Sequence, residues 1–369
     1  MPTPSAPPPI VVDAVGARIG IDTASLDAGD HRLVAAAWRD AQAPSTTAPD
    51  AVVVPRGARG TEQMLASLSM DVTRAAIAAR RGAAWLLHAA GVAAPDGRVV
   101  VFVGRSGAGK TTATRALGQR WGYVSDETVS IDAEGAVLPY RKPLSVITDG
   151  HDVKVQHAPA DLGLRPLPDA PLRVARVVLL DRHTDGGPAR LEPETLSGAL
   201  PDLAVNSSAL AAMADPLRTL ARVIARTGGV LRARYADARD LVPLVEELLA
   251  APPLASDIDD PTIPLRSAPD TAQTPPSTIE RAPFVDTCAL EDGRIAVLSA
   301  RDFGDAELRV LDGIGPSIWQ EAAGTTREQL IAAVERRHGA PPPGVAVDAL
   351  IDEAIEALHR EGLLVPARR

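Results

Sequence analysis

The segment Gly104-Arg-Ser-Gly-Ala-Gly109-Lys110-Thr111 decides how the larger part of this sequence folds. It fits the Walker A pattern GxxxxGK[ST]. An apolar run at 98–103, typical of a strand, precedes it, and a predicted helix begins near Lys110. Glycines let the backbone turn tightly, so that successive N–H groups and the helix N-terminus face a phosphate group. The segment therefore predicts a nucleoside triphosphate site, with a Gly-rich turn that binds no ligand as the alternative.

Each position of this loop has an expected task. Lys110 is expected to reach the β and γ phosphates, and the Thr111 hydroxyl to hold Mg²⁺. Only three lysines occur among 38 basic residues, so a lysine inside the motif is more informative than usual. The other nucleotide-binding residues are expected to be Gly104, Arg105, Ser106, Gly107, Ala108, Gly109 and Thr112.

Predicted strands and helices alternate around the loop, which indicates an α/β domain over residues 1–250. Residues 1–10 are expected to form a disordered tail, and residues 1–80 show little beyond an Ala-rich helical stretch at 62–80. Apolar runs typical of strands lie at 99–103, 128–131, 174–180 and 230–235, and helical stretches lie at 110–119, 216–226 and 241–249.

A Pro-rich linker is predicted at 251–283, where eight prolines alternate with polar residues without apolar periodicity. It separates the α/β domain from a small α+β domain at 284–369. In that second domain, strands are expected at 285–290, 294–299 and 307–311, and helices at 316–323, 327–337 and 347–360.

Composition and charge exclude several classes of protein. Hydrophobic residues make up 46% of the 369 residues, yet no apolar run approaches the roughly 18 residues that cross a bilayer, so a soluble protein without a membrane span is expected. Cys288 is the only cysteine, which excludes an internal disulfide and is typical of the cytoplasm. A net charge of -9 and an aromatic content of 3% argue against nucleic acid as a partner.

Two acidic positions compete for the base and metal tasks. Asp126 and Glu127 follow a strand-like run, whereas Asp181 follows the apolar run 177–180 and by pattern alone looks more like a Walker B residue. A carboxylate pair offers one group that accepts a hydroxyl proton and another that holds metal. For either position, a solvated acid at a strand end is the alternative interpretation.

Three blocks resemble the HPr kinase/phosphorylase superfamily in order and spacing: Leu86-Leu-His88-Ala-Ala-Gly-Val92, the loop at 104–112, and Tyr123-Val-Ser-Asp-Glu127. The sequence is most similar to the HPr-kinase-related proteins of peptide-modification clusters, over roughly residues 75–250. An isolated histidine on an apolar stretch is usually a core group. The resemblance instead implies that His88, Lys110 and Asp126 are catalytic, that Thr111 and Glu127 hold Mg²⁺, and that the nucleotide is ATP.

The C-terminal part resembles the PqqD family, whose members bind leader peptides of ribosomally made natural products. The resemblance rests on the blocks 310–319 and 359–364 and covers about residues 284–366. It implies a small winged-helix-type domain whose edge strand, expected at 307–311, takes up the peptide as a further strand. Residues 284–369 hold fifteen acidic and nine basic residues, which counts against DNA as the ligand.

Together the two resemblances imply a kinase that transfers the γ-phosphoryl group of ATP to a Ser or Thr hydroxyl of a precursor peptide held by the C-terminal domain. A flexible linker would raise the local concentration of a weakly bound acceptor. The alternatives are an adaptor without catalysis, in which nucleotide controls the release of the leader peptide, and a small-molecule kinase or hydrolase. Glu127 stands where bacterial HPr kinases have a second Asp, which counts against HPr itself as the substrate. The sequence leaves a homo-oligomer open.

Overall fold

The computed structural model describes residues 9–44, 48–56, 60–105, 107–146, 154–183, 187–252, 278–300, 306–339 and 346–365. These residues form two units. The N-terminal unit comprises the described residues within 1–214 and 222–258, and the C-terminal unit those within 215–221 and 259–369. Each helix in the described part is too short or too polar to cross a membrane.

The apolar run before the glycine-rich loop forms β6 (Arg98–Val103), near the middle of a six-stranded sheet. Its residues from Val99 onward are buried, as is typical of a strand covered on both faces. β6, β12 and β15 run parallel, whereas β5 and β13 run antiparallel to their neighbours and β7 pairs antiparallel with β5. The sheet order is β13 (Arg190–Glu194), β15 (Val230–Tyr235), β12 (Arg173–Arg182), β6, β5 (Ala89–Ala93) and β7 (Gly122–Ser125).

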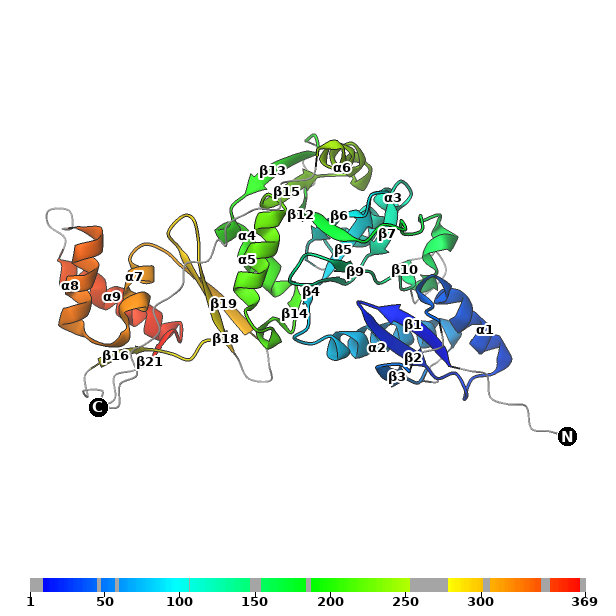
Figure 1. The fold of residues 1–369 in the computed structure, drawn as a ribbon, viewed down its shortest axis with the longest axis horizontal. Coiled ribbons are helices and arrows are strands. Elements are labelled where there is room, and N and C mark those ends of the chain that lie inside the picture. The colour runs from blue at the N-terminus through cyan, green and yellow to red at the C-terminus, as the bar shows by residue number, and fades with distance from the viewer. Residues whose placement is uncertain are drawn as a thin grey trace. The chain divides into compact units, whose positions relative to one another are not determined.

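Two helices cover one face of this sheet, α3 (Lys110–Gly118) and α6 (Leu241–Ala250) (Figure 1). Buried Leu117 of α3 and Val245 of α6 belong to the same core as Phe102 of β6. α4 (Leu196–Val205) belongs to the same unit, whereas α5 (Pro216–Arg226) is divided between the two units after residue 221. The predicted α/β architecture and the predicted helices at 110–119, 216–226 and 241–249 are therefore confirmed.

The smaller elements connect and flank the central sheet. A second sheet has the order β14 (Ser207–Ser208), β4 (Trp85–Leu87), β8 (Val129–Ile131) and β9 (Val137–Leu138), and β10 (Leu144–Val146) pairs with β11 (Val155–His157). Short 3-10 helices lie at Arg39–Ala41, Pro159–Leu162, Leu210–Ala212 and Ala238–Asp240.

The first 80 residues, which showed little pattern in sequence, form a layer with its own core. Its sheet has the order β1 (Ile10–Ala14), β2 (Ala17–Ile21) and β3 (Ala51–Val53), and its helices are α1 (Ala28–Ala37) and α2 (Thr61–Ala79). Ile10 is buried and pairs with Ile21, so the expected tail at 1–10 is wrong at this position. Residues 1–8 lie outside the described part.

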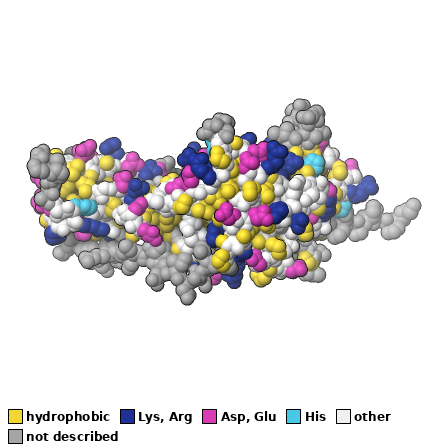
Figure 2. Space-filling model, turned by 90° about the horizontal axis from the view of Figure 1, so that it is seen from above, with side chains coloured by type: hydrophobic (Ala, Val, Ile, Leu, Met, Phe, Trp, Pro, Cys, Tyr) yellow, Lys and Arg dark blue, Asp and Glu magenta, His cyan; other side chains and the backbone are white. Residues whose placement is uncertain are grey.

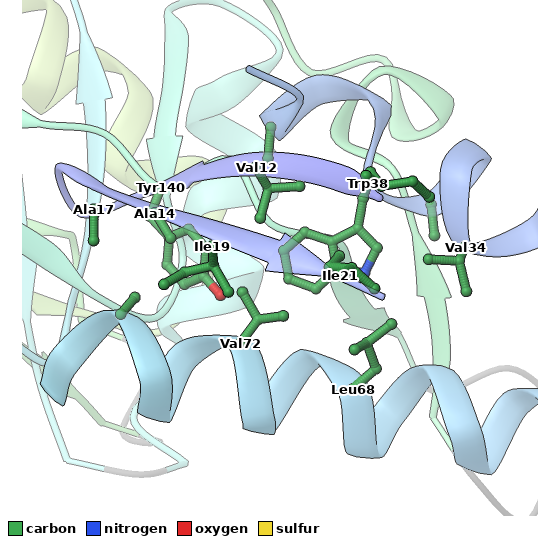
Figure 3. Close-up of a cluster of buried hydrophobic side chains, with 14 of the residues drawn as sticks. Val12, Ala14, Ala17, Ile19, Ile21, Val34, Trp38, Leu68, Val72 and Tyr140 are labelled. Atoms are coloured by element: carbon green, nitrogen blue, oxygen red, sulfur yellow. The ribbon is translucent and has the colours of Figure 1, made fainter. Parts of the chain in front are cut away.

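This layer packs α2 against its sheet. In Figure 3, Leu68 and Val72 of α2 point toward Ile19 and Ile21 of β2, with the Trp38 ring beside them. The turn between β1 and β2 places Val15 at φ +50° and Gly16 at φ +86°. Two successive positive φ values match the strand twist in a tight hairpin, but a β-branched residue rarely adopts one. The sequence therefore lacked the usual Asn-Gly signal for this hairpin.

We expect Leu68→Ala to lower the free energy of unfolding by about 2 to 5 kcal/mol, because it leaves a cavity in a closed core. Leu68 is 1% exposed, whereas Met70 on the same helix is 50% exposed. Met70→Ala is the matched control and should change stability by at most about 0.5 kcal/mol. Urea unfolding of both variants measures the difference. Equal effects would contradict the packing of α2 described here.

The C-terminal unit contains two three-stranded sheets and three helices in its described residues. One sheet has the order β17 (Asp286–Ala289), β18 (Ile295–Ala300) and β19 (Ala306–Leu311), as expected from sequence. The other places β16 (Thr278–Arg281) between β20 (Ala323–Thr326) and β21 (Leu364–Val365), which was not expected. The helices are α7 (Gly315–Glu321), α8 (Arg327–His338) and α9 (Val347–Arg360).

The position of β16 shortens the expected linker. Ile279 of β16 is 8% exposed and belongs to the same core as Trp319 and Ile351. The C-terminal unit therefore begins before Phe284, because β16 joins two strands that lie far apart in the sequence. Residues 253–277, the rest of the expected linker, lie outside the described part.

Candidate functional site

The topology of the central sheet brings four predicted segments to the same edge, the one at which the parallel strands end. β6 and β12 are parallel, and β7 has the same direction because both β6 and β7 pair antiparallel with β5. The glycine-rich loop follows β6, Asp126 follows β7, and Asp181 lies near the end of β12. His88 immediately precedes β5, whose start faces Val103 at the end of β6. In open α/β sheets, ligands bind at the carboxyl ends of the strands.

The loop has the backbone shape that its glycines permit. Gly107 and Gly109 adopt φ values of +84° and +91°, a region that side chains with a Cβ rarely enter. At Gly104 a Cβ atom would lie 3.0 Å from the Cβ of Ala108. Tyr235 of β15 secures the loop from the other side, because its hydroxyl donates to the Ala108 carbonyl at 2.8 Å. Ser106, a predicted phosphate contact, lies outside the described residues.

Lys110 is buried at the start of α3, with 7% of its surface exposed. Its ammonium group donates to the Gly104 carbonyl at 2.5 Å and to the Arg105 carbonyl at 3.3 Å. Burial lowers the pKa of Lys110, while the charges of Asp126 and Glu127 oppose that shift. The ammonium therefore bridges the loop at the point where phosphate oxygens can replace carbonyl oxygens as acceptors.

Thr111 and Asp126 are in direct contact. The Thr111 hydroxyl donates to Oδ2 of Asp126 at 3.0 Å, and the Tyr123 hydroxyl donates to Oδ1 at 3.0 Å. Asp126 is 6% exposed, and its carboxylate is held in one orientation by the buried Tyr123 hydroxyl and the partly buried Thr111 hydroxyl. Burial, followed by the negative charge of Asp126, raises the pKa of Tyr123 well above its ordinary value. A hydroxyl beside a carboxylate is a donor set that suits Mg²⁺.

Glu127 has a partner that the sequence prediction did not include. Oε2 of Glu127 lies 2.7 Å from the Lys142 ammonium, which is also 4.0 Å from Oδ1 of Asp126. Lys142 is one of only three lysines in the chain, and this rarity is a signal that could have marked it. The predicted metal ligands Thr111 and Glu127 therefore have different partners, Asp126 and Lys142 respectively.

His88 lies half-buried at the same edge. Its backbone N–H donates to the Asn206 carbonyl at 2.6 Å, which ties the start of β5 to the end of α4. Burial and then the positive charge of Lys110 lower the pKa of His88, although Glu127 and Asp126 act in the opposite direction. Both causes favour the neutral imidazole, which can accept a hydrogen bond at one ring nitrogen and donate one at the other.

Asp181 occupies a different part of the edge. Its side chain is 41% exposed and lies 3.7 Å from the Arg234 guanidinium. It lines a cavity of about 850 Å³ together with loop residues Gly104 and Gly107 and the side chains of Asn206 and Arg232. This volume suits a ligand of nucleotide size. The structure thus places Asp126 against Thr111 and Asp181 in the wall of the cavity.

Cations around this cavity are largely paired within the protein. Arg232 lies 2.7 Å from Glu194 and 3.3 Å from Asp202, and the more exposed Arg105 lies 4.0 Å from Asp202. On the face shown in Figure 2, basic and acidic side chains alternate instead of forming one broad basic area.

Comparisons with known proteins add little to this geometry. No family model and no curated protein matches the chain. Among solved structures, the chain is similar to the Hpr(Ser) kinase/phosphatase from Coxiella burnetii, with 16% sequence identity over 45% of this chain and 93% of that chain, and a TM-score of 0.25. Similarity at this level does not define a fold or an activity.

Proposed function

We propose that the N-terminal unit is an ATP-dependent phosphotransferase of the kinase type. One observation carries the proposal: Thr111, which follows the lysine of the glycine-rich loop, bonds at 3.0 Å to the buried Asp126, which follows β7 on the far side of β5. Phosphoryl transfer needs a cation on the phosphates, a hydroxyl and carboxylate for Mg²⁺, and a base for the acceptor. This edge of the sheet supplies each of these groups.

The proposed tasks follow the geometry. Phosphate oxygens replace the Gly104 and Arg105 carbonyls as hydrogen-bond acceptors of the Lys110 ammonium. The first backbone N–H groups of α3 donate to further phosphate oxygens. Asp126 accepts the proton of the acceptor hydroxyl, whose oxygen bonds to the γ-phosphorus while ADP leaves. His88, neutral and close to Lys110 and the acidic pair, positions the reacting groups. Mg²⁺, held by Thr111 and Glu127, would offset charge that develops on the phosphate oxygens.

The acceptor is, in our proposal, a Ser or Thr hydroxyl of a ribosomally made precursor peptide that the C-terminal unit captures. β19 supports this proposal, because it pairs only with β18 in its sheet and is therefore an edge strand among the described residues. An extended peptide adds to such an edge through main-chain hydrogen bonds. The acidic balance of this segment disfavours DNA as an alternative ligand.

Transfer to a peptide is the test of this function. The full chain is incubated with Mg²⁺ and ATP labelled at the γ-phosphate, together with a precursor peptide encoded beside its gene, and label on the peptide is measured. Label on Ser or Thr supports the proposal. Nucleotide binding without transfer would favour an adaptor, and transfer to a small molecule that survives deletion of residues 278–369, from β16 onward, would favour a small-molecule kinase.

Arg309→Pro should weaken peptide binding at least about tenfold, because it removes the backbone N–H group of this residue and interrupts the edge strand β19. The Arg309 side chain also pairs with Glu307 and with Glu361 at 2.5 Å. Arg309→Ala is therefore the matched control, since it removes the ion pairs but keeps the backbone. Fluorescence anisotropy of a labelled precursor peptide with the full chain measures both variants. Equal loss in both variants would contradict docking through the strand backbone.

A further inference from the structure

Lys142 is a buried cation that the proposed reaction does not use. It lies between β9 and β10 and is 3% exposed. Its ammonium is 2.7 Å from Glu127 and 4.0 Å from Asp126, and it donates to the Pro143 carbonyl at 3.0 Å. This burial keeps Lys142 from direct contact with a nucleotide or an acceptor, so its effect must pass through the acidic pair.

The surroundings keep Lys142 charged and fixed. Its ammonium is enclosed by the carboxylates of Glu127 and Asp126 and by the Pro143 carbonyl, so oppositely charged partners offset the burial of its charge. The preceding Tyr140 is fully buried in the core of the first layer, where its hydroxyl lies 2.9 Å from Thr73 of α2. The N-terminal layer therefore anchors the segment that carries Lys142. In this way the first 80 residues contribute to the position of a charged group at the site.

Charges at this edge already balance without a ligand. The Lys142 ammonium lies 2.7 Å from Glu127 and 4.0 Å from Asp126, and the Lys110 ammonium acts on the same two carboxylates, so two positive charges stand against two negative ones. A divalent cation that binds alone would add two positive charges to a buried, balanced cluster and compete with an ammonium already in contact. A cation that arrives with a triphosphate brings compensating negative charge toward Lys110.

We propose that Lys142 is the resident counter-cation of the Asp126–Glu127 pair and prevents a divalent cation from binding there without nucleotide. This inference rests on the proposed function and adds an order of binding to it. Lys142 acts as a positioning residue: it orients Glu127 and neutralises the pair until the metal and the nucleotide arrive together.

The test uses Mn²⁺ alone, titrated into the full chain without nucleotide and followed by electron paramagnetic resonance. Lys142→Met should bind Mn²⁺ at least about tenfold more tightly than the wild type, because the pair loses its internal cation. Lys154→Met is the matched control, since Lys154 is exposed and the change in net charge is the same. The double variant Lys142→Met with Glu127→Gln should return to the weak affinity of the wild type.

A second substitution keeps the test available where Lys142→Met does not fold. Lys142→Gln retains a hydrogen-bond donor for Glu127 without the charge, and it should show the same gain in Mn²⁺ affinity. A folded Lys142→Gln protein that binds Mn²⁺ no more tightly than the wild type would overturn the inference. An equal gain in Lys154→Met would also overturn it. Nucleotide-dependent melting of the wild type, measured separately, shows whether the proposed function itself has failed.

Discussion

Lys110→Ala should abolish the stabilisation that ATP and Mg²⁺ give to this protein. For the wild type, a ligand at a hundredfold above its dissociation constant raises the free energy of unfolding by about 2.7 kcal/mol. In the variant, the ammonium that bridges the Gly104 and Arg105 carbonyls is gone, and with it the cation that would bind the phosphates. Differential scanning fluorimetry with and without nucleotide measures the change in melting temperature for each protein.

The nucleotide-dependent shift, and not the absolute melting temperature, is the quantity to compare. Lys110 is buried, so its removal also changes the stability of the nucleotide-free protein. Lys154→Ala removes an exposed lysine and should keep the full shift. If millimolar concentrations of each nucleoside triphosphate left the melting temperature of the wild type unchanged, a nucleotide site at this loop would be ruled out.

Asp126→Asn should reduce phosphoryl transfer by about 10² to 10⁴ and keep most of the nucleotide affinity. The amide can still accept the Thr111 hydroxyl, so the contact between α3 and the end of β7 is preserved. It cannot take up the acceptor proton as a carboxylate does. Single-turnover transfer and nucleotide binding, measured on the same preparation, separate the loss of the base from the loss of the site.

Asp181→Asn is the matched control and should retain most of the transfer rate. Its carboxylate is partly exposed beside Arg234 and is separated from the Thr111 contact, although it lies at the same sheet edge. The opposite ranking of the two variants would move the base to Asp181. In that case the cavity wall, and not the Thr111–Asp126 contact, would be the reacting part of the site.

Local sequence signals determined the elements around the loop. The strand at 98–103, the glycines and Lys110 follow one another within a single strand, loop and helix unit, so each can be interpreted from its neighbours. The same holds for β15 and α9, whose observed bounds match the expected ones. Apolar periodicity and the backbone freedom of glycine are local properties of the chain. They therefore predict these strands, helices and turns without knowledge of the tertiary packing.

Three features depended on packing between distant segments. β16 is a strand because residues 323–326 and 364–365 pair with it. The first layer depends on α2, whose buried residues close the core over the sheet of β1, β2 and β3. At the site, the residue pattern alone left Asp126 and Asp181 as competitors and the resemblance favoured Asp126, but only the fold put Asp126 against Thr111.

The contact of Lys142 with Glu127 shows the reason most directly. These residues are separated in the sequence, yet their charges lie 2.7 Å apart after folding. A buried charge is stable only beside a partner, and which carboxylate serves as that partner is decided by the tertiary structure. The sequence by itself determined that this protein has a glycine-rich loop of the Walker A pattern between a strand and a helix, and the tertiary structure decided which charged groups surround it.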